Sequence, residues 1–196
     1  MKGNKVMKKL IALVLTAILA FSFAACTKKG SGDGSSDPAS DQPKSALELL
    51  ENVWKKYSSD EKFAAMGGSG KHMKEDKPGK FDAADAESLD FELGFPKADA
   101  AEIDDAASLV HMLNQNTFSC GVYHVKNGAG IEALAEKIKE NILARNWMCG
   151  FPEKLVILSV GDYIVSVFGD GELIGTFTSK LTGLYPVQTL VDVPIA

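Results

Sequence analysis

The chain has 196 residues, with 21 basic and 26 acidic side chains and a formal net charge of −5 at pH 7. Its first 26 residues hold four of the lysines and no acid, so the rest of the chain has 17 basic and 26 acidic side chains. This excess of negative charge argues against a nucleic-acid partner and against electrostatic attraction to anionic lipid headgroups.

Residues 1–25 have the organisation of an export signal. Four lysines lie within the first nine residues and are followed by "LIALVLTAILAFSFAA", sixteen residues without a charge. A helix that spans a membrane needs about 20 apolar residues, so this run is short for a permanent anchor. A basic segment, an apolar run and small residues at its end together predict a cleaved signal peptide over 1–25.

The residues at the expected cleavage point are Phe23-Ala24-Ala25-Cys26. They resemble a bacterial lipobox, although leucine is more usual at the position of Phe23. The resemblance implies that Cys26 carries a thioether-linked diacylglyceryl group, a palmitate-type anchor, and becomes the first residue of the mature protein. Two alternatives remain open, namely an ordinary secretory signal with an incidental cysteine and an N-terminal anchor that is retained.

The segment after Cys26 has the composition of a linker. Residues 27–44, "TKKGSGDGSSDPASDQPK", contain no large apolar side chain. Such a segment cannot bury enough surface to offset the entropy lost on ordering, so we expect 26–44 to form a lipidated cysteine and a flexible tether. Residues 45–196 suffice for a single domain with its own hydrophobic core.

The folded part opens with an amphipathic helix over 45–57, in which Ser45 and Glu48 form a capping box. Residues 61–81 are rich in glycine and lysine and are expected to be mostly loop. The segment from residue 82 to residue 105 contains nine acids and a single base, Lys97. The acids lack the spacing of a calcium-binding loop, so we expect an acidic surface exposed to solvent and no metal site. Within this stretch we expect a short strand over 88–95 and a short helix from Asp99.

Residues 108–127 form two apolar runs around "NQN", which predicts a β-hairpin centred on Gln115, with His111 opposite residue 119. The first run could instead complete a helix, so 102–113 stays open between helix and strand. Residues 130–147 predict the second main helix. Strands follow at 154–160 and 163–168, joined by a Gly161-Asp162 turn, and a third apolar stretch at 172–178 reads most simply as another strand.

Cys120 and Cys149 are the cysteines that remain once Cys26 is lipidated. Cys120 is expected about 20 Å before the end of its strand. The helix that follows runs antiparallel to this strand over a similar length, which places Cys149 near Cys120 along the strand direction. A disulfide is therefore possible in an extracytoplasmic compartment. The alternative is two reduced cysteines that pack as small apolar residues.

No catalytic, metal or cofactor site is predicted. The histidines His72, His111 and His124 have no spacing typical of a zinc site, and no serine or cysteine nucleophile motif is present. The hairpin register also keeps His111 and His124 from facing each other.

The lipobox, the tether and the segments "IEALAEKIKENILAR" and "LVILSVGDYIVSVF" resemble small uncharacterised lipoproteins of Gram-positive, clostridia-like bacteria. The resemblance implies an α+β domain on the extracytoplasmic face of the cell membrane. We expect an antiparallel sheet of four or five strands, covered on one face by the helices at 45–57 and 130–147. The expected function is a non-catalytic binding or accessory module for an envelope protein or peptide. The alternatives are an envelope hydrolase, using His111 or His124, and a small solute-binding lipoprotein.

Overall fold

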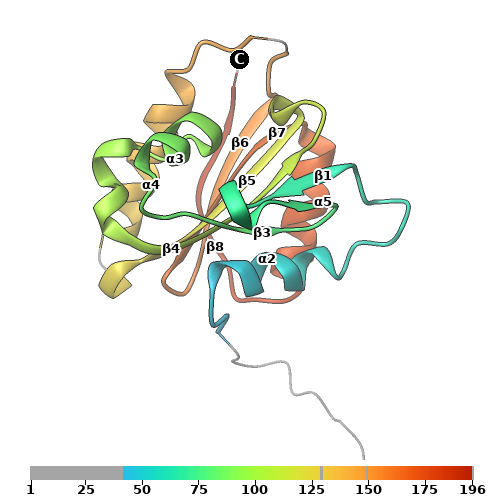
Figure 1. The fold of residues 1–196 in the computed structure, drawn as a ribbon, viewed down its shortest axis with the longest axis horizontal. Coiled ribbons are helices and arrows are strands. Elements are labelled where there is room, and N and C mark those ends of the chain that lie inside the picture. Colours follow the sequence, from blue (N-terminus) through green and yellow to red (C-terminus); the bar gives the residue numbers. More distant parts are fainter. Residues whose placement is uncertain (1–41, 129, 149, 196) are drawn as a thin grey trace, which may run out of the picture. The chain divides into compact units, whose positions relative to one another are not determined.

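The computed structural model describes residues 42–128, 130–148 and 150–195 (Figure 1). The expected signal peptide, Cys26, the tether up to residue 41 and Cys149 therefore lie outside the described residues. The helices among the described residues are α2 (Ala46–Trp54), α3 (Ala86–Leu93), α4 (Ile131–Leu143) and α5 (Gly171–Thr182). Four short 3-10 helices in the same residues lie in the connections between elements: η1 (Gly70–His72), η2 (Lys97–Glu102), η3 (Gln115–Thr117) and η4 (Lys126–Gly128).

The centre of the fold is an antiparallel sheet of eight strands in the order β2-β1-β4-β5-β7-β6-β8, with β3 also paired to β4. The α+β class is confirmed, but the expected number of strands, four or five, was too low. The strands are β1 (Ala65–Gly67), β2 (Lys74–Glu75), β3 (Gly79–Phe81), β4 (Ile103–His111), β5 (Phe118–Val125), β6 (Lys154–Val160), β7 (Tyr163–Gly169) and β8 (Gln188–Pro194).

Helices cover both faces of the sheet (Figure 1). α2 and α5 pack on one face in a cluster that includes Leu50 and Phe177, whereas α3 and α4 pack on the other in a cluster that includes Leu89 and Ile138. The expectation that the two main helices share a face was wrong. Every residue of β7 is buried, and such unbroken burial is typical of strands enclosed on both sides.

The β4–β5 hairpin is confirmed, and residues 103–111 are a strand. Leu109 lies opposite Cys120 and Val110 opposite Ser119, one residue from the expected register. η2 takes the place of the short helix expected from Asp99, because β4 already begins at Ile103. The strands expected at 154–160 and 163–168, with a turn between them, are also confirmed, and the second extends to Gly169.

Residues 88–95 were expected to be a strand and instead belong largely to α3. Leu89 and Leu93 are buried one helical turn apart, while Phe91 between them is 84% exposed. Asp85 caps the start of the helix, and Gly94, at a φ of 73°, ends it in the left-handed conformation that glycine adopts readily. Alternating apolar residues thus lie on opposite sides of a helix here.

The stretch at 172–178, also expected to be a strand, lies within α5. The carboxylate of Asp170 accepts hydrogen bonds from the backbone N–H groups of Glu172 and Leu173, which starts the helix. Ile174, Phe177 and Leu181 then follow at helical spacing and are buried. β8 was not foreseen, and residues 61–81, expected to be mostly loop, contain three short strands.

α2 begins as expected at an N-cap serine and ends earlier, at Trp54. The Ser45 hydroxyl accepts from the backbone N–H of Glu48 at 3.1 Å. The Glu48 carboxylate accepts from the N–H of Lys44 at 2.7 Å, so the capping box is only half formed. The N–H of Ala46 donates instead to the Asp105 carboxylate at 2.8 Å, which attaches the start of α2 to β4.

The core beneath α3 and α4 contains a buried hydroxyl without a partner. Tyr123 is fully buried, and its hydroxyl has no hydrogen-bond partner among the described residues. The hydroxyl lies over Gly121, where an added Cβ would come within 2.0 Å of it. Glycine at position 121 therefore leaves room for the phenol of Tyr123.

Replacing Tyr123 by phenylalanine is expected to leave the free energy of unfolding unchanged or to raise it by up to about 1 kcal/mol. The substitution keeps the ring and removes a hydroxyl that is desolvated without compensation. Urea unfolding measures the effect. The matched control is Ser119→Ala, because the buried Ser119 hydroxyl donates to the Gln115 carbonyl at 3.0 Å. A larger loss of stability in Tyr123→Phe than in this control would contradict the expectation.

Candidate functional site

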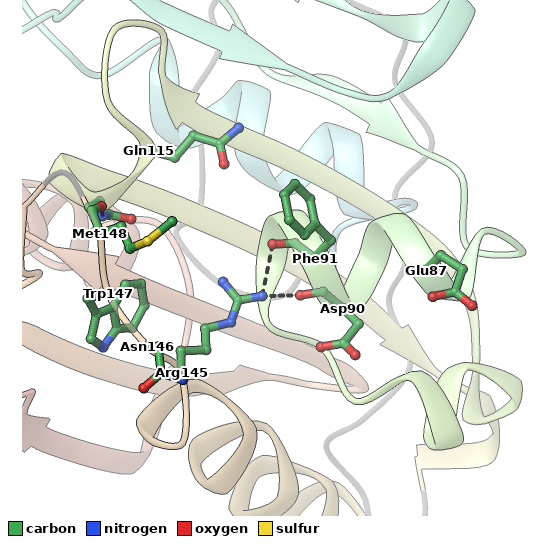
Figure 2. Close-up of a pocket in the computed structure, with 9 residues that line it drawn as sticks. Glu87, Asp90, Phe91, Gln115, Arg145, Asn146, Trp147 and Met148 are labelled. Carbon is green, nitrogen blue, oxygen red and sulfur yellow. Dashed lines mark hydrogen bonds between the residues drawn. The ribbon is translucent and has the colours of Figure 1, made fainter.

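A pocket of about 500 Å³ lies between α3, η3 and the segment that follows α4 (Figure 2). The residues around it come from three parts of the chain that are far apart in sequence. They comprise two acids, three amides, one arginine and three large apolar side chains. These are Glu87, Asp90, Phe91, Gln115, Asn116, Arg145, Asn146, Trp147 and Met148.

Arg145, the only arginine in the chain, lies at the centre of the pocket (Figure 2). Its Nη2 donates to the backbone carbonyls of Asp90 and Phe91, in the last turn of α3. The amide of Asn141 donates to the Asp90 carboxylate at 2.8 Å and to the Gly94 carbonyl at 3.0 Å. These bonds satisfy carbonyls at a helix C-terminus, so α4 and the segment after it fix the end of α3.

The surroundings of the Arg145 guanidinium are partly apolar. Its central carbon lies 5.9 Å from the Trp147 ring centre and 6.0 Å from that of Phe168. Burial lowers the pKa of Arg145, and the nearby charge of Asp90 acts in the opposite direction. Among the described residues, no carboxylate oxygen lies within 4 Å of this cation. Arg145 is therefore held by carbonyls and rings, and no acid within the described part of the chain forms an ion pair with it.

The other wall of the pocket is fastened to the β4–β5 turn. The Asn116 side-chain amide donates to the Met148 carbonyl at 2.9 Å and to the Gly150 carbonyl at 3.0 Å. Asn114 accepts from the backbone N–H of Asn116 and so fixes η3. The segment after α4 is thus anchored on both sides of residue 149.

Large apolar side chains that line the pocket, or lie close in sequence to its lining residues, are exposed to solvent. Phe91 is 84% exposed, Leu113 82%, Met148 78% and Phe151 77%. Phe91 and Met148 line the pocket, Leu113 lies two residues before Gln115, and Phe151 follows Gly150. We call these four residues the apolar rim. Large exposed apolar patches mark interaction surfaces, and Phe91 and Met148 expose apolar area at one pocket.

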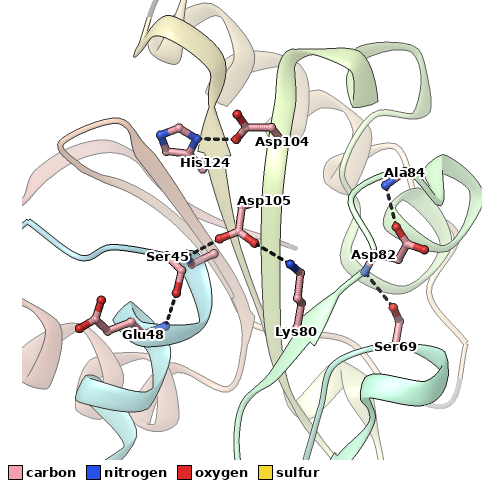
Figure 3. Close-up of polar contacts among 10 residues, drawn as sticks. Ser45, Glu48, Ser69, Lys80, Asp82, Ala84, Asp104, Asp105 and His124 are labelled. Carbon is pink, nitrogen blue, oxygen red and sulfur yellow. Dashed lines mark hydrogen bonds and ion pairs between the residues drawn. The ribbon is translucent and has the colours of Figure 1, made fainter.

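Polar contacts gather at the opposite end of the β4–β5 hairpin, where the described chain begins (Figure 3). Asp105 accepts from the N–H of Ala46 and lies 3.8 Å from the Lys80 ammonium. The Asp104 carboxylate lies 2.5 Å from Nδ1 of His124. Burial, and then the carboxylates around it, raise the pKa of Tyr163. Several acids of the 82–105 run thus hold elements together locally.

The structure does not bring His111 and His124 together. His124 lies opposite Asp105 and His111 opposite Ala65. The His111 ring stacks on Phe63 at 5.6 Å, and its Nδ1 accepts from backbone N–H groups of the turn. His72 lies on η1, apart from both. Within the described part of the chain, no three His, Cys, Asp or Glu side chains converge as metal ligands.

Cys120 is fully buried among the side chains between the sheet and α2 and α5, and burial raises the pKa of its thiol. It has no disulfide partner among residues 42–128, 130–148 and 150–195. Cys149 lies outside these residues, so the pairing of Cys120 with Cys149 stays a prediction.

The pocket was not foreseen from the sequence. Its one local signal is the segment "ARNWMCGFP", in which the sole arginine and exposed apolar residues follow an amphipathic helix. Comparison with protein-family models, curated proteins and solved structures finds no significant match to this chain. Of the helices in the described segments, none is both long and apolar enough to cross a membrane.

Proposed function

We propose that this protein is a lipid-anchored, extracytoplasmic binding or accessory module that engages another envelope protein or a peptide through the pocket and the apolar rim. One observation supports this most directly. The segment that precedes α2 enters the domain at one end of the sheet, and the apolar rim lies at the other end.

The register of the strands defines these two ends. Phe118 lies opposite Gly169, and Gly169 lies opposite Lys154, which places η3 and the segment after α4 at the same end. At the other end His124 lies opposite Tyr163, next to Asp105, to which the start of α2 is bonded. The nine residues of β4 separate these ends by about 30 Å.

The proposed anchor would leave the rim accessible. Gln42 follows Cys26 by sixteen positions in the sequence. A chain of that length spans at most about 55 Å, and a flexible one averages roughly 22 Å. The domain would therefore stay near the membrane, with its attachment at the end of the sheet opposite η3 and the segment after α4.

Charge favours a partner with basic groups among its apolar ones. The chain carries 23 acids and 15 bases between residues 42 and 195. Complementary charge speeds association and excludes partners of like sign, whereas the apolar contacts supply most of the affinity.

Photocrosslinking in the producing cells tests this proposal. A photoreactive amino acid at position 113, within the rim, is expected to give a discrete crosslinked product. Phe91→Ser should reduce that product at least fivefold. Position 73 is the matched control, because Met73 is 53% exposed and lies away from the pocket, in the η1–β2 segment. Equal products from positions 113 and 73, or no effect of Phe91→Ser, would refute the proposed surface.

A further inference from the structure

The two terminal nitrogens of Arg145 have different surroundings. Nη2 bonds to the Asp90 and Phe91 carbonyls, but no hydrogen bond is formed by Nη1 among the described residues. In Figure 2 this second nitrogen projects into the space between Phe91, Met148 and Gln115. A guanidinium offers five N–H donors, and the two on Nη1 are directed at the pocket.

We infer that Arg145 binds a carboxylate, and that the ligand is the C-terminal carboxylate of a peptide with apolar side chains. This inference rests on the proposed function and names the ligand class for the same pocket. Arginine binds carboxylates by directed, charge-assisted hydrogen bonds, which are stronger than neutral ones.

The guanidinium is already in place for such a ligand. Two carbonyls of α3 and the rings of Trp147 and Phe168 hold it, so little side-chain entropy remains to be lost on binding. Its partial burial leaves a positive charge that water solvates poorly and that no acid within 4 Å compensates among the described residues. An incoming carboxylate supplies that compensation.

The two acids that line the pocket are engaged elsewhere. Glu87 forms an ion pair with Lys97, and the carboxylate of Asp90 accepts from Asn141. Both contacts reduce the repulsion that a bound carboxylate would meet. The longer-range repulsion from the acidic domain is screened beyond about 8 Å at physiological ionic strength.

The rest of the lining suits a peptide better than a small organic acid. The amide side chains of Gln115 and Asn146 also line the pocket and can pair with backbone N–H and carbonyl groups (Figure 2). Phe91, Trp147 and Met148 provide apolar contact for side chains. Recognition of a peptide C-terminus in this manner combines one anchored charge with pockets for adjacent residues.

The test compares two peptide libraries on the full-length, lipid-modified protein in detergent. One contains N-acetylated tripeptides with apolar side chains and free carboxylates, and the other contains the same peptides as C-terminal amides. Binding is followed by calorimetry. The carboxylates are expected to bind at least tenfold more tightly than the amides, and Arg145→Gln should remove this difference. Lys62→Met should keep it, since Lys62 is also a cation beside a ring, 5.3 Å from Trp54, but outside the pocket.

A second variant covers the case in which Arg145→Gln does not fold, since Arg145 also fixes α3. Met148→Glu places a negative charge at an exposed position of the lining and should weaken carboxylate binding at least tenfold without touching the α3 contacts. Equal binding of carboxylates and amides, or no binding of either, would overturn the inference. Binding of 4-methylpentanoate as tight as that of the peptides would overturn the peptide assignment. Whatever these binding measurements give, the crosslinking experiment at position 113 tests the proposed function independently of them.

Discussion

Full-length protein carrying Cys26→Ser is expected in the aqueous fraction of lysed cells and without incorporated acyl label, whereas the unsubstituted protein sediments with membranes. The thioether of the expected lipid forms only on a cysteine sulfur, so serine removes the attachment point. Each buried methylene contributes about 0.8 kcal/mol to membrane binding, so an anchor with two acyl chains holds the protein stably on the membrane. Without these chains, that binding free energy is lost entirely. No helix of the described residues could take over that role by spanning the bilayer.

Labelling with an alkyne analogue of palmitate, followed by fractionation and mass measurement, distinguishes the three hypotheses for the N-terminus. A lipoprotein loses the label and the membrane association together when Cys26 is replaced. An ordinary secretory signal gives a cleaved, unlabelled chain in both proteins. A retained anchor gives a chain that keeps residues 1–25 and sediments in both. Cys149→Ser is the control and should keep both label and membrane association.

The sequence predicted best those elements whose boundaries are set by local chemistry. The turn residues at Gln115 and Gly161 fixed both hairpins to within one residue, because glycine and asparagine adopt turn conformations at little cost. α4 has an apolar stripe and a charged side, so its 3.6-residue period is unambiguous over thirteen residues.

The helices α3 and α5, which were predicted to be strands, show the limit of prediction from local sequence patterns. Leu89, Phe91 and Leu93 alternate as in a strand, and only the capping at Asp85 and Gly94 together with packing shows that Phe91 points outward. Short apolar segments are compatible with both periods, and their tertiary neighbours decide. The same holds for β8, whose strand partner among the described residues is β6, which begins more than thirty positions earlier in the sequence.

The pocket required information that no local pattern carries. Its residues belong to α3, to the β4–β5 turn and to the segment after α4, which the sheet order brings together. The sequence showed an arginine after an amphipathic helix, but not that its Nη2 would be bound to α3 carbonyls more than fifty residues earlier. The functional prediction made from the sequence was the lipid anchor, which concerns the location of the protein and not what it recognises.

Phe177→Ala is expected to lower the free energy of unfolding by about 3–5 kcal/mol, the largest effect we expect within the folded domain. Phe177 is fully buried between α5 and the sheet, with its ring 5.7 Å from that of Phe118. Removing it loses the transfer free energy of the ring and leaves a cavity that the flanking strands cannot fill. A loss of this size is a large share of the roughly 5–15 kcal/mol that stabilises a typical domain.

Gly175→Ala on the same element gives the matched control and has the opposite expected sign. Nothing lies within 4 Å of a Cβ added at Gly175, so alanine fits without strain. In the interior of a helix this substitution stabilises by about 0.5–1 kcal/mol, because glycine loses more backbone entropy on folding. Urea unfolding of both variants measures the pair. A stabilising Gly175→Ala with a strongly destabilising Phe177→Ala supports a helix over 171–182 packed on the sheet. A destabilising Gly175→Ala would contradict the helix, because alanine is depleted in strands and favoured in helices.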